Sequence, residues 1–270
     1  MSFLTNSIIS ILARFRDVPL STAQQHRGER TLYMCGYPIS GNSWTSYMLS
    51  YALNIRYDTA DGVMTPQRRP LIPLLSGTNP HRGGEKFDCI LKNHASPTNV
   101  DLRPNDAIVY IVRDGRDVVN SYFHRVEKMW KLDERRIRRI VSRLSFLVPN
   151  RIRYWMATRY FAVLWARQVE EALEMGVPLV RYEDVLDDPQ GEIERLITLL
   201  DPDASLEGTA KAVELFTLEK MRASVRKANV GPVTDRVGRA GNWKEYFSPR
   251  DIKWFDRQYG DLMQRLGYDR

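Results

Sequence analysis

The sequence predicts an α/β fold, a three-layer α/β/α arrangement around a central parallel sheet, with a P-loop-like turn after the first strand. Short apolar runs near residues 31–36, 87–93, 107–112 and 178–182 are typical of buried strands. Stretches with helical spacing lie between and after them, at 45–53, 151–175 and 189–200. Such alternation favours a parallel sheet covered on both faces. A length of 270 residues fits one core, so we expect a single domain over residues 1–270.

The first predicted strand leads into a polar turn at residues 37–44 and then into a helix. Backbone N–H groups at a helix start and the helix dipole both favour an anion, so this order predicts a phosphate cradle. Gly41 permits close approach of the backbone, and Ser40, Asn42 and Ser43 add side-chain donors. With Trp44 at its end, the turn supplies the first candidate nucleotide-binding residues. The alternative is a turn that only caps a core helix.

The same turn resembles a Walker A loop, Gly-x-x-x-x-Gly-Lys-Ser, in which Asn42 stands where the lysine belongs. Without that lysine, ATP hydrolysis by the usual route is not expected. A P-loop kinase or NTPase remains a rival hypothesis, because Asp114 follows a strand much as a Walker B acid does.

A second phosphate site is predicted after the apolar, β-branched strand 107–112. Arg113 follows its carboxyl end, where open α/β sheets bind ligands, and Ser121 comes two helical turns later. A guanidinium group and a hydroxyl near one point suit a phosphate. For Asp114, Arg116 and Asp117 we predict a solvated turn that caps the following helix.

The later elements are predicted from packing and capping signals. The aromatic residues of the helix at 151–175 are expected to lie in the core. Asp188 is the expected N-cap of the helix at 189–200. The basic region 125–153 is interpreted as a solvated helix face, with recruitment of an acidic substrate or a membrane surface as the alternative.

A third phosphate-binding segment, residues 236–244, is basic and punctuated by glycines. Arg236, Val237 and the Gly238 backbone N–H are its candidate nucleotide-binding groups. The alternative is a surface loop with one anchoring tryptophan, Trp243.

Together, these segments resemble the sulfotransferase family that uses 3′-phosphoadenosine 5′-phosphosulfate (PAPS). Residues 37–44 look like its 5′-phosphosulfate loop, Arg113 with Ser121 like its 3′-phosphate site, and residues 236–244 like its Arg-x-Gly-x-x-Gly-x-Trp-Lys motif. Residues 92–94, Lys-Asn-His, are similar to the family's Lys-Thr-His element, and residues 181–184 to its Tyr-Glu-Asp segment. The resemblance implies an enzyme with one sulfotransferase domain, PAPS as donor, PAP as product and no metal.

The resemblance also implies roles for individual residues. Tyr182 corresponds to the tyrosine that contacts the adenine, and His94 to the general base that takes the proton of an acceptor hydroxyl. Ile39 departs from the family, which usually has a lysine there to bridge the 5′-phosphate and the transferring group. We expect Lys92 to supply the missing charge; alternatives are Arg239, or a protein that binds nucleotide and transfers poorly.

Composition restricts the partners. A net charge of +7 favours an anionic ligand, for which the nucleotide suffices, so no nucleic acid is expected. The two cysteines, Cys35 and Cys89, are read as buried free thiols of a reducing compartment, and the four histidines lack zinc spacing. No transmembrane run is apparent, and a cytoplasmic protein is expected. The partly apolar residues 2–14 are interpreted as a docked helix, with a membrane-surface contact as the alternative.

The acceptor is the least determined part of this interpretation. We expect a hydroxyl of a small molecule, with an amine, a glycan or a glycolipid as alternatives. The stretch 57–85, rich in proline and glycine, is predicted to be a long irregular insert that shapes the acceptor pocket, with a disordered excursion as the alternative. The protein is expected to be a monomer or a homodimer, and a non-catalytic nucleotide-binding protein remains a competing hypothesis.

Overall fold

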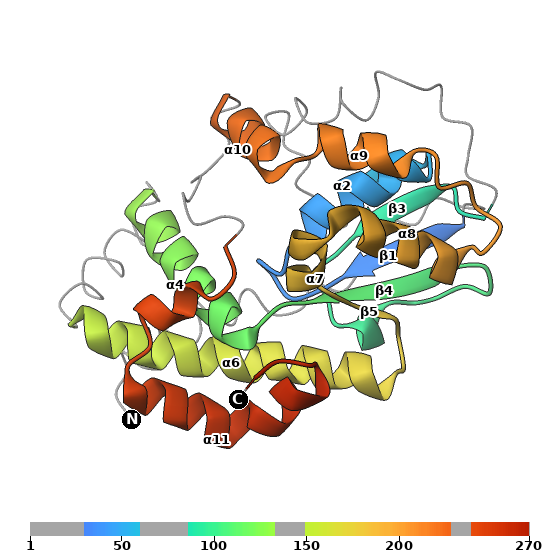
Figure 1. Ribbon diagram of the computed structural model, residues 1–270. Coiled ribbons are helices and arrows are strands. Elements are labelled where there is room, and N and C mark those ends of the chain that lie inside the picture. The colour runs from blue at the N-terminus through green and yellow to red at the C-terminus, as the bar shows by residue number, and fades with distance from the viewer. Residues whose placement is uncertain (1–29, 60–85, 133–148, 228–238, 270) are drawn as a thin grey trace.

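The computed structural model describes residues 30–59, 86–132, 149–227 and 239–269. Residues 2–14, most of the stretch 57–85, the central part of the basic region 125–153, and Arg236 to Gly238 therefore lie outside the described residues. The described chain contains a central sheet with helices on both of its faces (Figure 1). The predicted three-layer α/β/α class is confirmed.

Within the described ranges the sheet has five strands, all parallel, in the order β2-β3-β1-β4-β5. Their bounds are β1 Thr31–Cys35, β2 Arg56–Thr59, β3 Cys89–Lys92, β4 Ala107–Val112 and β5 Leu179–Arg181. The chain moves to one side of β1 for β2 and β3 and to the other for β4 and β5. Next to β1 the order reverses, and at such a reversal the loops leaving neighbouring strands diverge and leave room for a ligand.

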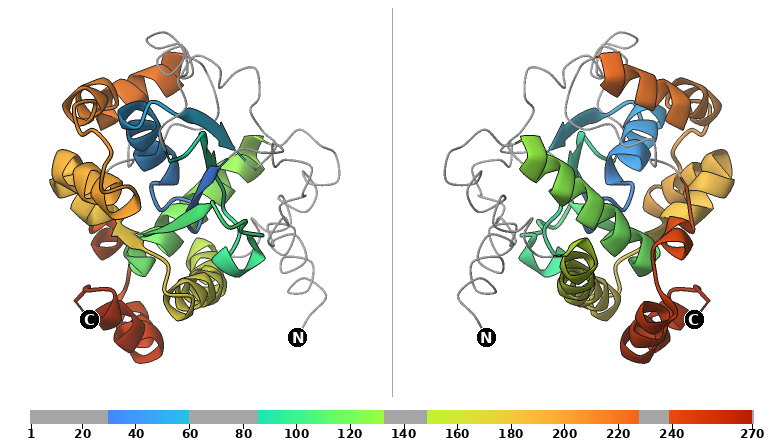
Figure 2. Two further views of the ribbon diagram at one scale, coloured as in Figure 1. Left: turned by 90° about the vertical axis from the view of Figure 1, so that its right-hand side faces the viewer. Right: turned by 90° about the vertical axis from the view of Figure 1, so that its left-hand side faces the viewer.

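The helices form two groups on opposite faces of the sheet (Figure 2). One face is covered by α4 Gly115–Leu132, α6 Asn150–Glu174 and α11 Pro249–Arg265. The other is covered by α2 Asn42–Ala52, α7 Tyr182–Asp187, α8 Pro189–Leu200 and α9 Thr209–Leu215, with α10 Leu218–Lys227 following α9. Two short 3₁₀ helices, η4 Pro97–Asn99 and η5 Asn242–Glu245, complete the described elements.

Alternation along each strand explains why the sheet has two cores. In β4, Tyr110 and Val112 face the α4/α6/α11 side, whereas Val109 and Ile111 face the α2 side. Every second residue of β1 divides in the same way, and all five of its residues are buried. A strand buried on both faces needs a continuous apolar run, which is the signal that located these strands in the sequence.

The predictions for Asp188 and for the two cysteines are confirmed. Asp188 caps α8, since its Oδ1 accepts a hydrogen bond of 2.9 Å from the Gly191 N–H. Cys35 and Cys89 are buried free thiols, and burial raises the pKa of Cys35. Among the described residues, no helix is long and apolar enough to cross a membrane.

Two expectations are wrong. Residues 57–59, placed in an irregular insert, belong to the edge strand β2. On α6, Phe161 and Trp165 lie in the core as expected, but Trp155 is 52% exposed. Its ring instead faces the Arg159 guanidinium, whose carbon lies 4.5 Å from the ring centroid.

Candidate active site

The carboxyl ends of the three central strands carry the predicted site residues. β1 ends at Cys35, shortly before the 37–44 loop; β3 ends at Lys92, two residues before His94; and β4 ends at Val112, next to Arg113. Tyr182 follows the neighbouring strand β5 as the first residue of α7. Parallel strands bring these four segments to one edge of the sheet, although they are far apart in the sequence.

The 37–44 loop has the backbone of a tight anion cradle. Ile39 and Gly41 have φ angles of 75° and 98°, which bend the chain sharply into α2. The Trp44 and Thr45 N–H groups donate to the Gly41 carbonyl, so α2 begins directly at the loop. The N–H groups that precede Trp44 at the start of α2 have no earlier helical turn to bond to, which makes this end of the helix suited to an anion. The Ser40 hydroxyl is buried and has no hydrogen-bond partner among the described residues.

Asn42 braces the loop against the segment that follows β3. Its Nδ2 donates to the Gly36 and Asn93 carbonyls, both at 3.2 Å. A Cβ at Gly36 would lie 2.6 Å from the Ile111 carbonyl oxygen and 2.7 Å from Asn42 Oδ1, and the clash with the backbone oxygen explains why glycine stands there. The Asn42 side-chain amide therefore donates both of its hydrogen bonds within the protein. Of the Asn42 donors, this leaves the backbone N–H for a ligand.

His94 is held by the same brace. Its Nδ1 lies 2.9 Å from the Gly36 carbonyl oxygen, which can only accept, so Nδ1 carries the proton. In the neutral imidazole the basic lone pair is then on Nε2. The His94 carbonyl accepts a hydrogen bond of 3.2 Å from Gln168 of α6. The ring is thus fixed by Gly36, which follows β1, and the backbone of His94 by α6.

Lys92 is the last residue of β3 and is 4% exposed. Strand alternation places it on the face shared with Ile90, which packs on the α2 side of the sheet. In register it lies opposite Met34 of β1. The residue thus starts from the same face as the helix that begins at the phosphate cradle.

Arg113 connects two loops. Its Nη1 donates to the Ile39 carbonyl at 3.2 Å and its Nη2 to the Arg239 carbonyl at 2.9 Å. The guanidinium carbon lies 4.7 Å from the Tyr182 ring centroid, and Nε is buried with no partner among the described residues. Ser121, the other predicted member of this site, is half-buried on α4.

The prediction of a solvated turn after Arg113 is wrong. Asp114, Arg116 and Asp117 are 7%, 6% and 0% exposed. Asp114 does cap α4, since Oδ1 accepts from the Arg116 N–H at 2.8 Å, and it also pairs with the Arg116 side chain at 2.8 Å. The Arg116 guanidinium lies 4.3 Å from the Trp243 ring centroid. The segment around Trp243 covers Arg116 and Asp117, and the Asp114 N–H donates to Glu183 of α7 at 3.1 Å.

Tyr182 packs directly on the phosphate cradle. A Cβ at Gly41 would lie 2.4 Å from the Tyr182 ring, so only glycine allows this contact. Trp44 meets the Tyr182 ring edge-on, with 6.0 Å between centroids, and its Nε1 donates to the Phe216 carbonyl. The Trp44 indole is 8% exposed, so it supports Tyr182 from inside the protein.

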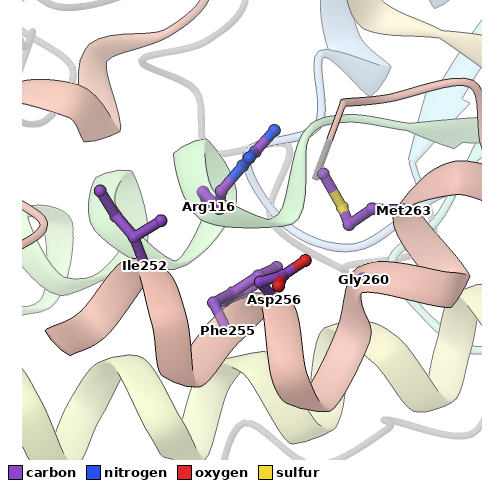
Figure 3. A pocket seen from close by; sticks show the side chains of 6 residues that line it. All are labelled: Arg116, Ile252, Phe255, Asp256, Gly260 and Met263. Carbon is purple, nitrogen blue, oxygen red and sulfur yellow. The ribbon is translucent and has the colours of Figure 1, made fainter. Parts of the chain in front are cut away.

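A small cavity lies beside this site between α4 and α11 (Figure 3). Arg116, Ile252, Phe255, Asp256, Gly260 and Met263 line it. Its volume of about 10 Å³ is close to that of a single water site. It is far too small for a nucleotide, and of the residues described above it includes only Arg116.

The structure therefore brings Ser40, Gly41, Asn42, Ser43, Trp44, Lys92, His94, Arg113 and Tyr182 to one edge of the sheet, with Ser121 further along α4. Comparison with known proteins identifies what this arrangement belongs to. The sulfotransferase domain family matches residues 29–267, which is most of the chain. The chain belongs to the sulfotransferase family. The resemblance noted in the sequence is confirmed, and the protein is an enzyme that transfers a sulfuryl group.

Named relatives of this sulfotransferase are distant. Sulfotransferase 6B1 of Danio rerio is 22% identical over 253 residues, covering 89% of this chain and 83% of that protein. Flavonol 3-sulfotransferase of Flaveria bidentis is 23% identical, with 87% of this chain and 82% of that protein covered. Amine sulfotransferase of Oryctolagus cuniculus is 22% identical, with 86% of this chain and 80% of that protein covered.

Solved structures support the fold of the sulfotransferase. Retinol dehydratase, in complex with androsterone and the inactive cofactor PAP, has a TM-score of 0.59 at 20% identity, covering 86% of this chain and 80% of its own. The sulfotransferase domain from the curacin biosynthetic pathway has a TM-score of 0.52 at 14% identity, with 90% and 99% covered.

Sequence reasoning missed several residues that shape the site of this sulfotransferase. Gln168 and Glu171 of α6 hold the segment after β3: Gln168 bonds the His94 carbonyl, and Glu171 accepts from Ser96 and, at 3.1 Å, from Thr98. Nothing in their spacing on a long helix distinguishes them from surface residues. Asp117 was identified in the sequence but was predicted to be exposed to solvent, whereas it is buried.

Proposed function

We propose that this sulfotransferase takes its sulfuryl group from PAPS and transfers it to a hydroxyl group of a small molecule. Retinol dehydratase and a mouse sulfotransferase of the same fold were solved with PAP bound. Relatives are named for flavonol and amine acceptors, and retinol dehydratase was solved with androsterone. These names support a small-molecule acceptor, with a hydroxyl as our choice and an amine, glycan or glycolipid as alternatives.

One observation carries the proposal: the Gly36 carbonyl accepts hydrogen bonds from both Asn42, in the anion cradle, and the His94 imidazole. PAPS supplies the transferable sulfuryl group on its 5′-phosphate and carries a second phosphate at the 3′ position. The residues present fit its sulfated end: the buried Ser40 hydroxyl has no partner in the described part of the chain, and the N-terminus of α2 favours negative charge.

Arg113 and Ser121 are the proposed 3′-phosphate site, and Tyr182 is the proposed adenine contact. The Arg113 Nε is buried without a partner among the described residues, while its two other nitrogens already position the group. A guanidinium group held in place by carbonyls loses little freedom when it meets a phosphate. Arg236, Val237 and Gly238 complete the proposed set but lie outside the described residues.

His94 is the proposed general base. The Gly36 carbonyl keeps the proton on Nδ1, so Nε2 is the atom that takes the proton from the acceptor hydroxyl. Gln168 and the brace of Asn42 hold the backbone of this segment in place. Lys92 is the proposed cation that stabilises charge on the leaving phosphate, in place of the lysine that Ile39 replaces.

Two measurements test the proposal. PAP at saturating concentration should raise the melting temperature of the protein, because a ligand that binds only the folded state stabilises it, whereas ATP with Mg²⁺ should not. Labelled sulfate from PAPS should then appear on phenolic or alcoholic members of an acceptor panel. Stabilisation by ATP–Mg²⁺ alone would instead favour the P-loop kinase hypothesis, and PAP binding without transfer would favour a non-catalytic nucleotide-binding protein.

A further inference from the structure

Asp117 is a buried carboxylate that neither the sulfuryl transfer nor the proposed nucleotide contacts use. It lies in the first turn of α4, one helical turn after Arg113, and its side chain has no exposed surface. A carboxylate without solvent is stable only where hydrogen bonds and an opposite charge compensate for its lost hydration. Its partners therefore show what it holds.

Three groups surround the Asp117 carboxylate. Oδ2 accepts from the Gly241 N–H at 2.7 Å and lies 3.7 Å from the Arg113 Nη2. Oδ1 accepts from the Trp243 N–H at 2.9 Å. Burial raises the pKa of Asp117, while these two N–H groups and Arg113 oppose that rise. One side chain of α4 thus binds the backbone of the distant 239–243 segment at two points.

Arg113 binds the same segment through a backbone carbonyl, whereas Asp117 binds it through backbone N–H groups. It donates to the Arg239 carbonyl, whereas Asp117 accepts from the N–H groups of Gly241 and Trp243. Arg113 also donates to the Ile39 carbonyl of the 37–44 loop. α4 and η5 lie side by side, so this pair ties the end of β4 to both loops (Figure 1). The 239–243 segment is therefore bound by Asp117 and by Arg113, whose opposite charges also lie 3.7 Å apart.

We propose that Asp117 is a positioning residue: it holds Arg113 and the 239–243 segment in one arrangement, and so sets the preference of the enzyme for a nucleotide with a 3′-phosphate. The proposal rests on the proposed function, in which Arg113 binds that phosphate. Asp117 touches neither the nucleotide nor the reacting atoms. It acts by fixing the direction of the guanidinium group and by anchoring the residues that directly follow 236–238.

Charge alone predicts the opposite effect, which makes the proposal testable. Removing a negative charge 3.7 Å from Arg113 would strengthen phosphate binding if Asp117 acted only through its field. Asp117→Asn also replaces one acceptor oxygen by an NH₂ group that would face a backbone N–H, which releases the 239–243 segment. Asp117→Glu keeps the charge and moves it by one methylene. If positioning dominates, both variants weaken the 3′-phosphate preference.

The experiment compares the binding of PAP with that of adenosine 5′-phosphate, which lacks the 3′-phosphate, by calorimetry. The readout is the dissociation constant of adenosine 5′-phosphate divided by that of PAP, which measures the preference for the 3′-phosphate. We expect Asp117→Asn and Asp117→Glu each to reduce this ratio by about tenfold or more, the size expected for losing one hydrogen bond to a charged acceptor. Binding of adenosine 5′-phosphate should change little.

Asp106→Asn is the matched control. Asp106 precedes β4 at the opposite end of that strand, its side chain is 1% exposed, and it also accepts a backbone N–H and pairs with an arginine: Thr31 N–H at 2.8 Å and Arg103 at 2.9 Å. Its replacement should lower stability without changing the ratio of dissociation constants.

An unchanged ratio in the folded Asp117 variants, or an increased ratio in Asp117→Asn, would overturn the positioning role and leave the proposed function standing. The same holds if neither variant folds, since Asp117 would then serve stability alone. If the wild-type enzyme itself binds PAP no better than adenosine 5′-phosphate, the proposed function fails together with this inference.

Discussion

Ile39 is a β-branched residue in the left-handed region of the backbone, with φ of 75°. Such a residue costs on the order of 1–3 kcal/mol there, and it persists only where its surroundings impose it. Its carbonyl accepts from Arg113, and its side chain is partly buried against the core on the α4 side. The unusual residue therefore lies where the phosphate cradle meets the proposed 3′-phosphate site.

Lys92→Ala should lower turnover by about two orders of magnitude, the usual contribution of one charge-stabilising group, while PAP affinity changes much less. Adding Ile39→Lys to that variant should restore about tenfold or more, because it returns a cation to the loop. Transfer kinetics with labelled PAPS measure both effects. Ile39→Gln in the same background is the uncharged control, and equal rates for the glutamine and lysine variants would contradict this role of charge.

His94→Ala should abolish measurable transfer while leaving the dissociation constant of PAP nearly unchanged. The physical reason is that Nε2 is the only proposed acceptor of the hydroxyl proton, whereas the cradle is built from the 37–44 loop and α2. Single-turnover assays and calorimetry on the same preparation check the two halves. Wild-type turnover in this variant would remove His94 from the mechanism.

At the scale of elements, three helices begin at or near the segments that form the candidate active site. α2 starts at the cradle, α4 starts beside Arg113, and α11 starts just after the 239–243 segment. α11 begins with a capping box, in which the Ser248 side chain accepts from the Asp251 N–H and the Asp251 side chain accepts from the Ser248 N–H. Asp251 also pairs with Arg159 of α6 at 3.1 Å, which fixes α11 against α6.

Ser248→Ala should lower the free energy of unfolding by about 1 kcal/mol, the usual cost of losing an N-cap hydrogen bond. Ser248→Thr keeps a hydroxyl acceptor and should retain most of that stability. Urea unfolding of the three proteins measures the difference. Equal midpoints for the wild-type and alanine proteins would show that the Ser248 hydroxyl contributes nothing to stability.

At the scale of the whole molecule, the two ends of the sheet carry different chemistry. The carboxyl end holds the candidate active site, whereas the amino end holds ion pairs such as Arg30–Asp88 and Arg103–Asp106. Hydrogen bonds from Arg30 lower the pKa of Asp88 from its ordinary value of 3.8 to about 2. The pair joins the chain just before β1 to the chain just before β3.

The lowered pKa means that the folded protein favours ionised Asp88, so its contribution to stability is present above pH 3.8 and is lost as the pH falls towards 2. The wild-type protein should therefore exceed Asp88→Asn in stability near pH 5, and the gap should narrow over that window. Chemical unfolding of both proteins from pH 5 to pH 2 measures the gap. A stability difference that stays constant with pH would show that the pKa of Asp88 is not lowered by folding.

Much of the fold could be predicted because its strands are buried on both faces. β1, β3, β4 and β5 have apolar runs that mark them in the sequence. The edge strand β2, Arg-Tyr-Asp-Thr, is half-buried along its length and has no such run, so it was missed. Its identity as a strand comes from pairing with β3, which is a contact between segments far apart in the chain.

The sequence by itself determined the fold class and the order of the phosphate-binding segments, because these depend on local patterns of burial, turns and helix starts; the family followed from the resemblance of those segments to sulfotransferase motifs. Only the tertiary structure decided that Asp117 is buried, that Asn42 braces the chain instead of presenting its amide, and that His94 carries its proton on Nδ1. The physical reason is that burial and hydrogen bonding depend on partners across the fold. The partners of Asp117 lie 124 and 126 residues away, and no local pattern encodes them.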